Sequence, residues 1–269
     1  MGKKEKKEKK EKKKYLIGMI LFSIALVVCV IGMIYMNWKK QQGQKNFEEL
    51  TDKYVQETEQ NTTEKVSETE EETESETVAI PEKEIDWDEL KQENEDIYAW
   101  IYVPGTQIDY PILQHPKEDD YYLNRNLDGS SGYPGCIFSE RCNAKDFTDN
   151  NTVLYGHNMK NGTMFGDLHK FEDDTFFEEY RYVYIYTPEG NHAYEIATAG
   201  TFSDKHIMYS YDFTNRKDFD SFVEDLSTAE HIHDEVKEKE VYGNRLLTLS
   251  TCINGRPNNR WIVTAVEIQ

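Results

Sequence analysis

Hydrophobic and polar positions divide the chain into four stretches, and the first two differ sharply. Residues 1–14 are almost entirely lysine and glutamate. Residues 15–36 contain no charged side chain, and a helix over this run would be roughly 33 Å long, enough to cross the hydrocarbon core of a bilayer. We therefore predict one transmembrane helix over residues 15–37, because the run is too long for the apolar region of a cleaved signal peptide.

The lysines at the N-terminus also predict the orientation of that helix. Positively charged residues collect on the cytoplasmic side of a membrane, and residues 1–14 carry a denser block of lysines than the far end, which has Lys39, Lys40 and Lys45. We expect a single-pass protein of the cell membrane with a cytoplasmic tail over residues 1–14. Everything after Trp38 is then outside the cell.

The third stretch, residues 38–84, is polar and acidic. Its second half is dominated by glutamate, threonine and serine, with very few large apolar side chains. Such a segment cannot bury enough surface to offset the entropy lost on folding. We predict a disordered, self-repelling stalk; a specific acidic docking segment is the alternative.

The fourth stretch, residues 85–269, returns to short apolar runs rich in Tyr, Phe, Ile and Val. It is long enough for one core of ordinary domain size. Amphipathic spacing predicts a helix near 86–98 and another over 218–232, while residues 182–203 alternate like a β-hairpin. Many short strands without a regular strand–helix–strand rhythm predict a mixed β-barrel decorated by helices.

The last two predicted strands, "LLTLSTC" and "RWIVTAVEI", place two reactive side chains close together. Because side chains alternate along a strand, Thr248, Ser250 and Cys252 share one face. If the two strands pair antiparallel through the "INGRPNN" loop, Cys252 and Arg260 lie at the same end of the sheet.

Charge and cysteine content narrow the functional classes. The formal net charge is −20, which argues against nucleic acid as a partner. Outside the predicted membrane helix the chain has three cysteines, Cys136, Cys142 and Cys252. An odd number in an exported domain flags one thiol left free for chemistry. Cys136 and Cys142 could pair across a loop, and no CxxC or HxxxH spacing indicates a zinc site.

Three features supply the parts for acyl transfer: "YGHN" with His157, "TLSTC" with Cys252, and Arg260. A cysteine nucleophile needs thiolate character, which a nearby imidazolium favours. The oxygen that becomes negative during attack needs hydrogen-bond donors, and arginine offers a permanently charged fork of them. Taken singly, a strand-end cysteine is most often a core residue and a single histidine most often a structural hydrogen-bonding group.

Together these features resemble the sortase family, and class B most closely. The segment "TLSTC" matches the TLxTC signature of that family, and "NTVLYGHNMKNGTMFGDL" resembles the segment that carries its catalytic histidine. The predicted helices near 86–98 and over 218–232 resemble the class B additions to the barrel. The resemblance covers about residues 85–269 and implies a closed β-barrel of about eight strands, with an N-terminal helix and an inserted helix before the nucleophile strand.

The resemblance also implies roles for single residues. Cys252 would be the nucleophile, His157 the general acid and base, and Arg260 the clamp for the oxyanion or the substrate. Arg256 is the alternative clamp, because the loop after the cysteine varies in length within the family. Ile253 stands where some relatives carry an acidic residue, which leaves any acidic role beside the nucleophile in doubt. The expected substrate-binding residues are Ser250, Thr251, Leu123 and Tyr209.

The activity implied by the resemblance is that of a cysteine transpeptidase that needs no metal and no organic cofactor. It would cleave the sorting motif of exported proteins after threonine, form a thioester, and pass the protein to an amine of a lipid-linked peptidoglycan precursor in a Gram-positive type of wall. Three alternatives stay open: a pilus-polymerising sortase that uses a pilin lysine, a hydrolytic cysteine protease, and a non-catalytic membrane-anchored scaffold in which Cys252 is a core residue.

Overall fold

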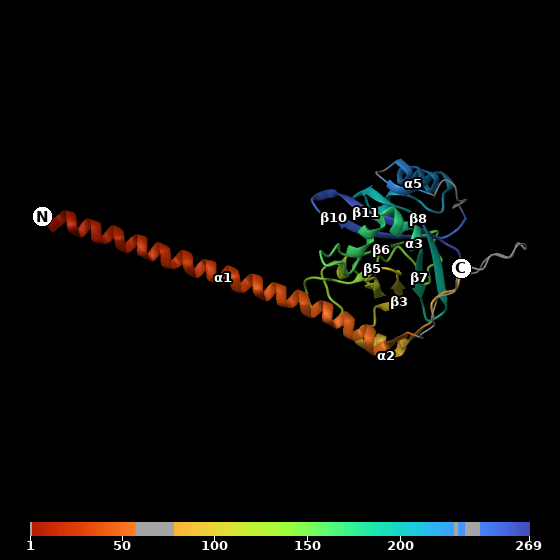
Figure 1. The fold of residues 1–269 in the computed structure, drawn as a ribbon, viewed down its shortest axis with the longest axis horizontal. Coiled ribbons are helices and arrows are strands. Elements are labelled where there is room, and N and C mark those ends of the chain that lie inside the picture. Colours follow the sequence, from red (N-terminus) through yellow and green to blue (C-terminus); the bar gives the residue numbers. More distant parts are fainter. Residues whose placement is uncertain (1, 58–77, 229–230, 235–242) are drawn as a thin grey trace, which may run out of the picture.

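The computed structural model describes residues 2–57, 78–228, 231–234 and 243–269. Helix α1 (Gly2–Tyr54) extends away from a β-barrel domain that contains the rest of the described chain (Figure 1). Within the described residues, Lys13–Lys39 is the one helical stretch long and apolar enough to cross a membrane. It overlaps the predicted span over residues 15–37, and its large apolar side chains are exposed, as a lipid-facing surface requires.

The beginning of the predicted stalk has regular structure, unlike the expectation from its composition. Helix α1 continues to Tyr54, and β1 (Val55–Glu57) pairs antiparallel with β2 (Lys83–Ile85). Glutamine, lysine and glutamate are good helix formers, and a helix already nucleated by its apolar segment extends at little cost. The disorder predicted for residues 58–77 lies outside the described residues.

Eight strands close into a barrel. Among the described residues the strand order is β11-β10-β6-β5-β4-β3-β7-β8, and pairing of β8 with β11 joins the two ends. A further short strand, β9 (His231–Asp234), adds to β8 outside the closed ring. The predicted barrel of about eight strands is therefore confirmed. Its strands are β3 (Ile97–Tyr102), β4 (Asp109–Leu113), β5 (Ile137–Ser139), β6 (Asn151–Tyr155), β7 (Tyr182–Tyr186), β8 (Asn191–Ser203), β10 (Leu246–Ile253) and β11 (Arg256–Glu267).

Helices are inserted between the strands, and both predicted ones are present but shorter than expected. Asp86 caps the first helix by accepting a hydrogen bond from the Glu89 amide at 3.0 Å. That helix ends before the predicted residue 98, because the backbone turns extended at Asn94 and β3 follows. The second ends at Thr228, and β9 takes the last predicted residues. The helical elements are α2 (Trp87–Glu93), η1 (Tyr121–Leu123), η2 (Gly166–Glu172), α3 (Asp174–Glu179), α4 (Ile207–Ser210) and α5 (Arg216–Thr228).

Two hydrophobic cores stabilise the domain. The larger fills the barrel and includes the fully buried Trp100, Leu247 and Leu249. The smaller lies between α5 and the outside of the barrel, where Phe222 and Leu226 are completely buried. The apolar face predicted for this helix is thus confirmed, and it fastens α5 to the barrel.

Gly156, the residue directly after β6, packs closely against the larger core. A Cβ atom at this position would lie 2.5 Å from Ile137 Cδ1 and 2.8 Å from the Phe165 ring. Both neighbours are fully buried, so neither ring nor methyl group can move away freely. A glycine is required here because the backbone lies against the core.

Replacing this glycine therefore tests the packing. Gly156→Ala should lower the free energy of unfolding by about 1–3 kcal/mol through overpacking, which corresponds to roughly 2–4 °C per kcal/mol in the melting temperature of a domain this size. The matched control is Gly190→Ala, because nothing lies within 4 Å of a Cβ there. Thermal unfolding of the full chain in detergent measures both, and equal melting temperatures for the two variants would contradict the packing described.

Candidate active site

The ends of β10 and β11 bring a cysteine and an arginine together. The strands pair antiparallel, and the Cα atoms of Cys252 and Arg260 are direct register partners. The register shifts at the next residue, Ile253, as the chain enters the connecting turn. The predicted position of both residues at one end of the sheet is confirmed.

A histidine reaches the same edge from the other side of β10. Strand β6 runs parallel to β10, with Tyr155 opposite Ser250 as their last pair. Parallel strands end at the same edge of a sheet. His157, two residues after the end of β6, therefore lies at the same edge as Cys252, which is next to last in β10. The Thr251 hydroxyl donates to the Gly156 carbonyl at 2.8 Å and so holds the residue before His157 against the residue before Cys252.

These residues surround a cavity of about 240 Å³. Six of the seven predicted site residues line it; the exception is Tyr209. Tyr209 is 70 % exposed and stacks on the outer side of His206, with ring centroids 4.1 Å apart. Its position gives no support to the predicted substrate contact. The predicted residues on the cavity are Leu123, His157, Ser250, Thr251, Cys252 and Arg260.

A backbone carbonyl holds His157 in one orientation. The distance from His157 Nε2 to the Leu123 carbonyl oxygen is 2.7 Å, and since a carbonyl only accepts, Nε2 carries the proton. Nδ1 is therefore the nitrogen left to exchange a proton. The ring of Tyr133 covers the imidazole, with centroids 4.7 Å apart. Burial lowers the pKa of His157 below its ordinary value, and the hydrogen bond to Leu123 only partly opposes this.

Arg260 is fixed by the beginning of its own strand, β11. Its Nη1 donates to the Pro257 carbonyl at 3.0 Å and to the Asn259 carbonyl at 2.9 Å. An arginine has five N–H donors, so these bonds leave the Nε and Nη2 groups for a ligand in the cavity. The alternative clamp, Arg256, is exposed and lies outside the cavity lining.

Comparison with known proteins agrees with this geometry. A family model described as the sortase domain matches residues 101–268. The chain belongs to the sortase family. Sortases are cysteine transpeptidases, and the solved structure of Clostridium perfringens sortase B is 32% identical, with a TM-score of 0.60 over 68% of this chain and 99% of that one. The predicted resemblance to class B is confirmed.

Two further sortase B proteins, from other organisms, are also similar to this chain. Sortase B of Listeria monocytogenes is 34% identical over 172 residues, which are 61% of this chain and 65% of that protein. A sortase B–substrate complex from Staphylococcus aureus has a TM-score of 0.60 and 28% identity, over 68% of this chain and 84% of that one.

An acid–imidazole pair in the cavity wall of this sortase, with the acid buried and the imidazole partly exposed, has no counterpart in the sequence predictions. His206 Nε2 lies 2.6 Å from Glu140 Oε2, and both side chains line the cavity. His206 Nδ1 accepts from the Tyr209 amide at the start of α4, so Nε2 carries the proton donated to Glu140. The pair ties the segment after β8 to the end of β5. Desolvation raises the pKa of Glu140, and the His206 imidazole opposes that rise.

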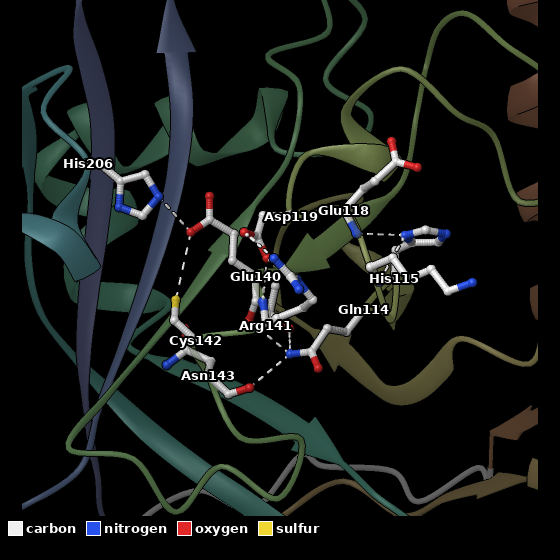
Figure 2. A network of polar contacts seen from close by, with 11 residues as sticks. Gln114, His115, Glu118, Asp119, Glu140, Arg141, Cys142, Asn143 and His206 are labelled. Atoms are coloured by element: carbon white, nitrogen blue, oxygen red, sulfur yellow. Dashed lines mark hydrogen bonds and ion pairs between the residues drawn. The ribbon is translucent and has the colours of Figure 1, made fainter.

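Figure 2 shows how the residues around Glu140 hold it from several sides. Cys142 directs its thiol at the Glu140 carboxylate, and the amide of Gln114 donates to the Glu140 carbonyl at 2.9 Å. The neighbouring Arg141 forms a two-pronged ion pair with Asp119, at 2.8 and 3.2 Å. No motif or spacing links these residues along the chain, so sequence alone carried no signal for them.

The cysteines separate into two kinds. All four, each within the described residues, are free, so the possible Cys136–Cys142 disulfide does not form. Burial raises the pKa of Cys136 well above that of an ordinary thiol, and burial beside Glu140 raises the pKa of Cys142 to about 11. Both therefore stay protonated at neutral pH, and Cys252 is the cysteine that lines the cavity. Across the part of the chain that the structure describes, no group of three His, Cys, Asp or Glu residues could hold a metal ion.

The environment of His157 predicts its titration. Burial disfavours the imidazolium, so the midpoint should lie below about 6.5. Tyr133→Ala removes the covering ring and admits water, which should raise the midpoint toward that value. NMR titration of histidine-labelled protein in detergent, assigned with His157→Gln, measures both. A midpoint at or above the ordinary value, or a downward shift in Tyr133→Ala, would contradict this account.

Proposed function

We propose that this sortase is a membrane-anchored transpeptidase in which Cys252 is the nucleophile, His157 the general acid and base, and Arg260 the clamp for the developing oxyanion. The observation that carries the proposal is their convergence on one cavity from three separate places in the chain. Of the three cysteines in the barrel domain, Cys252 is the one that shares a cavity wall with an imidazole and a guanidinium.

The chemistry follows from these positions in two steps. Cys252 Sγ attacks a peptide carbonyl and its proton passes to His157; the carbon–nitrogen bond then breaks, His157 protonates the departing amine, and a thioester remains. An incoming amine next attacks the thioester and gives its extra proton to His157. The carbon–sulfur bond breaks, a new amide forms, and the thiol regains its proton.

His157 and Arg260 are suited to their parts in this scheme. The hydrogen bond from Nε2 to Leu123 keeps Nδ1 available, and the lowered pKa leaves the imidazole uncharged before attack, so it can accept the proton. Arg260 has N–H donors left beyond its two hydrogen bonds to backbone carbonyls. Its charged guanidinium beside the reacting carbonyl stabilises the negative oxygen of the tetrahedral intermediate.

The proposed acyl donor is the C-terminal sorting motif of an exported protein, cleaved after threonine, and the proposed acceptor is an amine of a lipid-linked peptidoglycan precursor. Two observations support this choice. A Staphylococcus aureus sortase B has been solved with its substrate, and helix α1 offers an anchor beside the barrel. With the lysine-rich tail in the cytoplasm, the anchor would hold the cavity at the outer membrane surface, where both substrates are concentrated.

The first test removes the nucleophile. Cys252→Ala should abolish cleavage of every active member of a threonine-containing peptide library, because no other group on the cavity can form the thioester. The melting temperature should stay within about a degree of the parent value, since Cys252 is exposed and outside both cores. Chromatography of the cleaved peptides measures turnover; residual cleavage by a folded Cys252→Ala protein would exclude this cysteine as the nucleophile.

The second test separates the two candidate clamps. Arg260→Ala should lower kcat/KM for the same peptide on the order of 10²-fold or more, as loss of an oxyanion donor does. Arg256→Ala is the matched control, because it removes an arginine of the same strand that lies outside the cavity lining, and it should stay within about threefold of the parent. The reverse ranking would assign the clamp to Arg256.

A further inference from the structure

The carbonyl group of Cys252 is held by an asparagine side chain that lies outside the cavity. Asn158 Nδ2 donates to the Cys252 carbonyl oxygen at 2.8 Å, and His169 Nε2 lies 3.4 Å from the same oxygen. The regular pairing of β10 with β11 shifts directly after Cys252. At this exposed strand end, the Asn158 side chain therefore supplements the backbone hydrogen bonds in fixing the peptide group that follows Cys252.

His169 determines which way the Asn158 amide points. The distance from His169 Nδ1 to Glu172 Oε1 is 2.6 Å, and that from His169 Nε2 to Asn158 Nδ2 is 3.0 Å. An ionised carboxylate only accepts, so Nδ1 carries the proton and Nε2 accepts from the amide. The two N–H groups of Asn158 thus point to His169 and to the Cys252 carbonyl, and each member of the chain orients the next.

Strand β11 fastens this chain of contacts to the barrel. The imidazole of His169 stacks on the indole of Trp261, with ring centroids 5.2 Å apart and planes 27° apart. Trp261 Nε1 also donates to the Leu168 carbonyl at 2.9 Å and so holds η2 in place. Trp261 is nearly fully buried and directly follows Arg260, which makes it a firm support beside the clamp.

We propose that Asn158, His169 and Glu172 are positioning residues that hold Cys252 at its reacting distance from His157. The proposal rests on the proposed role of Cys252 as the nucleophile. Asn158 is the next residue after His157, so its bond to the Cys252 carbonyl links the backbones of the two reacting groups. Displacement of a reacting group by about 1 Å can cost 10²-fold in rate, and this link restricts such displacement.

An isosteric variant tests the central member. Asn158→Asp replaces the donating amide by a carboxylate, which repels the Cys252 carbonyl and the lone pair of His169 Nε2. For full-length protein in detergent, with a peptide that the parent cleaves, kcat should fall on the order of 10- to 100-fold, while KM stays within about twofold because the cavity wall is unchanged. Asn254→Ala, an exposed asparagine of the next loop, should leave kcat within about twofold.

The terminal member gives a second test that leaves the cavity and the core untouched. Glu172→Gln removes the charge that orients His169 and should lower kcat roughly 2- to 10-fold. The control Glu224→Gln makes the same charge change at an exposed position of α5 and should leave kcat unchanged. If Glu172 acts through Asn158, Glu172→Gln should have no further effect in an Asn158→Ala background. Additive losses, or a kcat for Asn158→Asp within twofold of the parent, would overturn the proposal.

Alkylation separates a failure of the positioning role from a failure of the proposed function. Iodoacetamide should modify Cys252 in the parent and in Asn158→Asp, and modified parent protein should cleave no peptide. Modified protein that still cleaves would refute Cys252 as the nucleophile and the positioning role with it. Parent protein that is inactivated, beside an Asn158→Asp variant with full kcat, would refute the positioning role alone.

Discussion

The register of one strand, β10, determines where every residue of the active site lies. It pairs parallel with β6 on one side and antiparallel with β11 on the other. The first pairing ends beside His157 and the second aligns Cys252 with Arg260. A slip of one residue would turn each side chain of β10 to the opposite face, moving Leu247 and Leu249 out of the barrel interior and turning Cys252, on the other face, away from the cavity. Burial of those leucines therefore stabilises the catalytic alignment as well as the fold.

The remaining walls of the cavity depend on the segment inserted between β8 and β10. Helix α5 is fastened to the barrel by its own small core, and the bond from His206 to Glu140 ties the start of the segment to β5. On the opposite side, the carbonyl of Leu123 in η1 fixes the His157 ring. The groups proposed to react thus sit at or just beyond strand ends, while inserted elements shape the space in which a peptide would lie.

Sequence patterns predicted the parts of the site that follow from strand geometry. Alternation along "LLTLSTC" and an antiparallel partner were enough to place Cys252 opposite Arg260, and the resemblance to sortases supplied His157 and the barrel. The contacts that orient these residues were not predictable in the same way. Leu123 acts through a backbone carbonyl, which any residue type could provide, and the bonds of Glu140 to His206 and of Asn158 to His169 join segments that only the tertiary fold brings together.

Tertiary pairing also explains where the predicted element boundaries were wrong. The helical pattern near residues 86–98 continues past Glu93, yet the final residues pair with β4 and become strand. Likewise, β8 draws His231–Asp234 into the sheet after α5 ends. In both places hydrogen bonds to a neighbouring strand outweigh the small helix propensity of a few residues.

The central claim is that the thiol of Cys252 carries the acyl group between donor and acceptor. Rapid acid quenching of the full chain with a cleavable threonine-containing peptide, followed by intact-mass measurement and peptide mapping, tests it directly. We expect a mass increase equal to the mass of the peptide acid that ends in threonine less one water, located on Cys252 and removed by hydroxylamine. The claim would be contradicted if the parent or the His157→Gln variant cleaved the peptide without forming this adduct. It would also be contradicted by an adduct on Cys136 or Cys142.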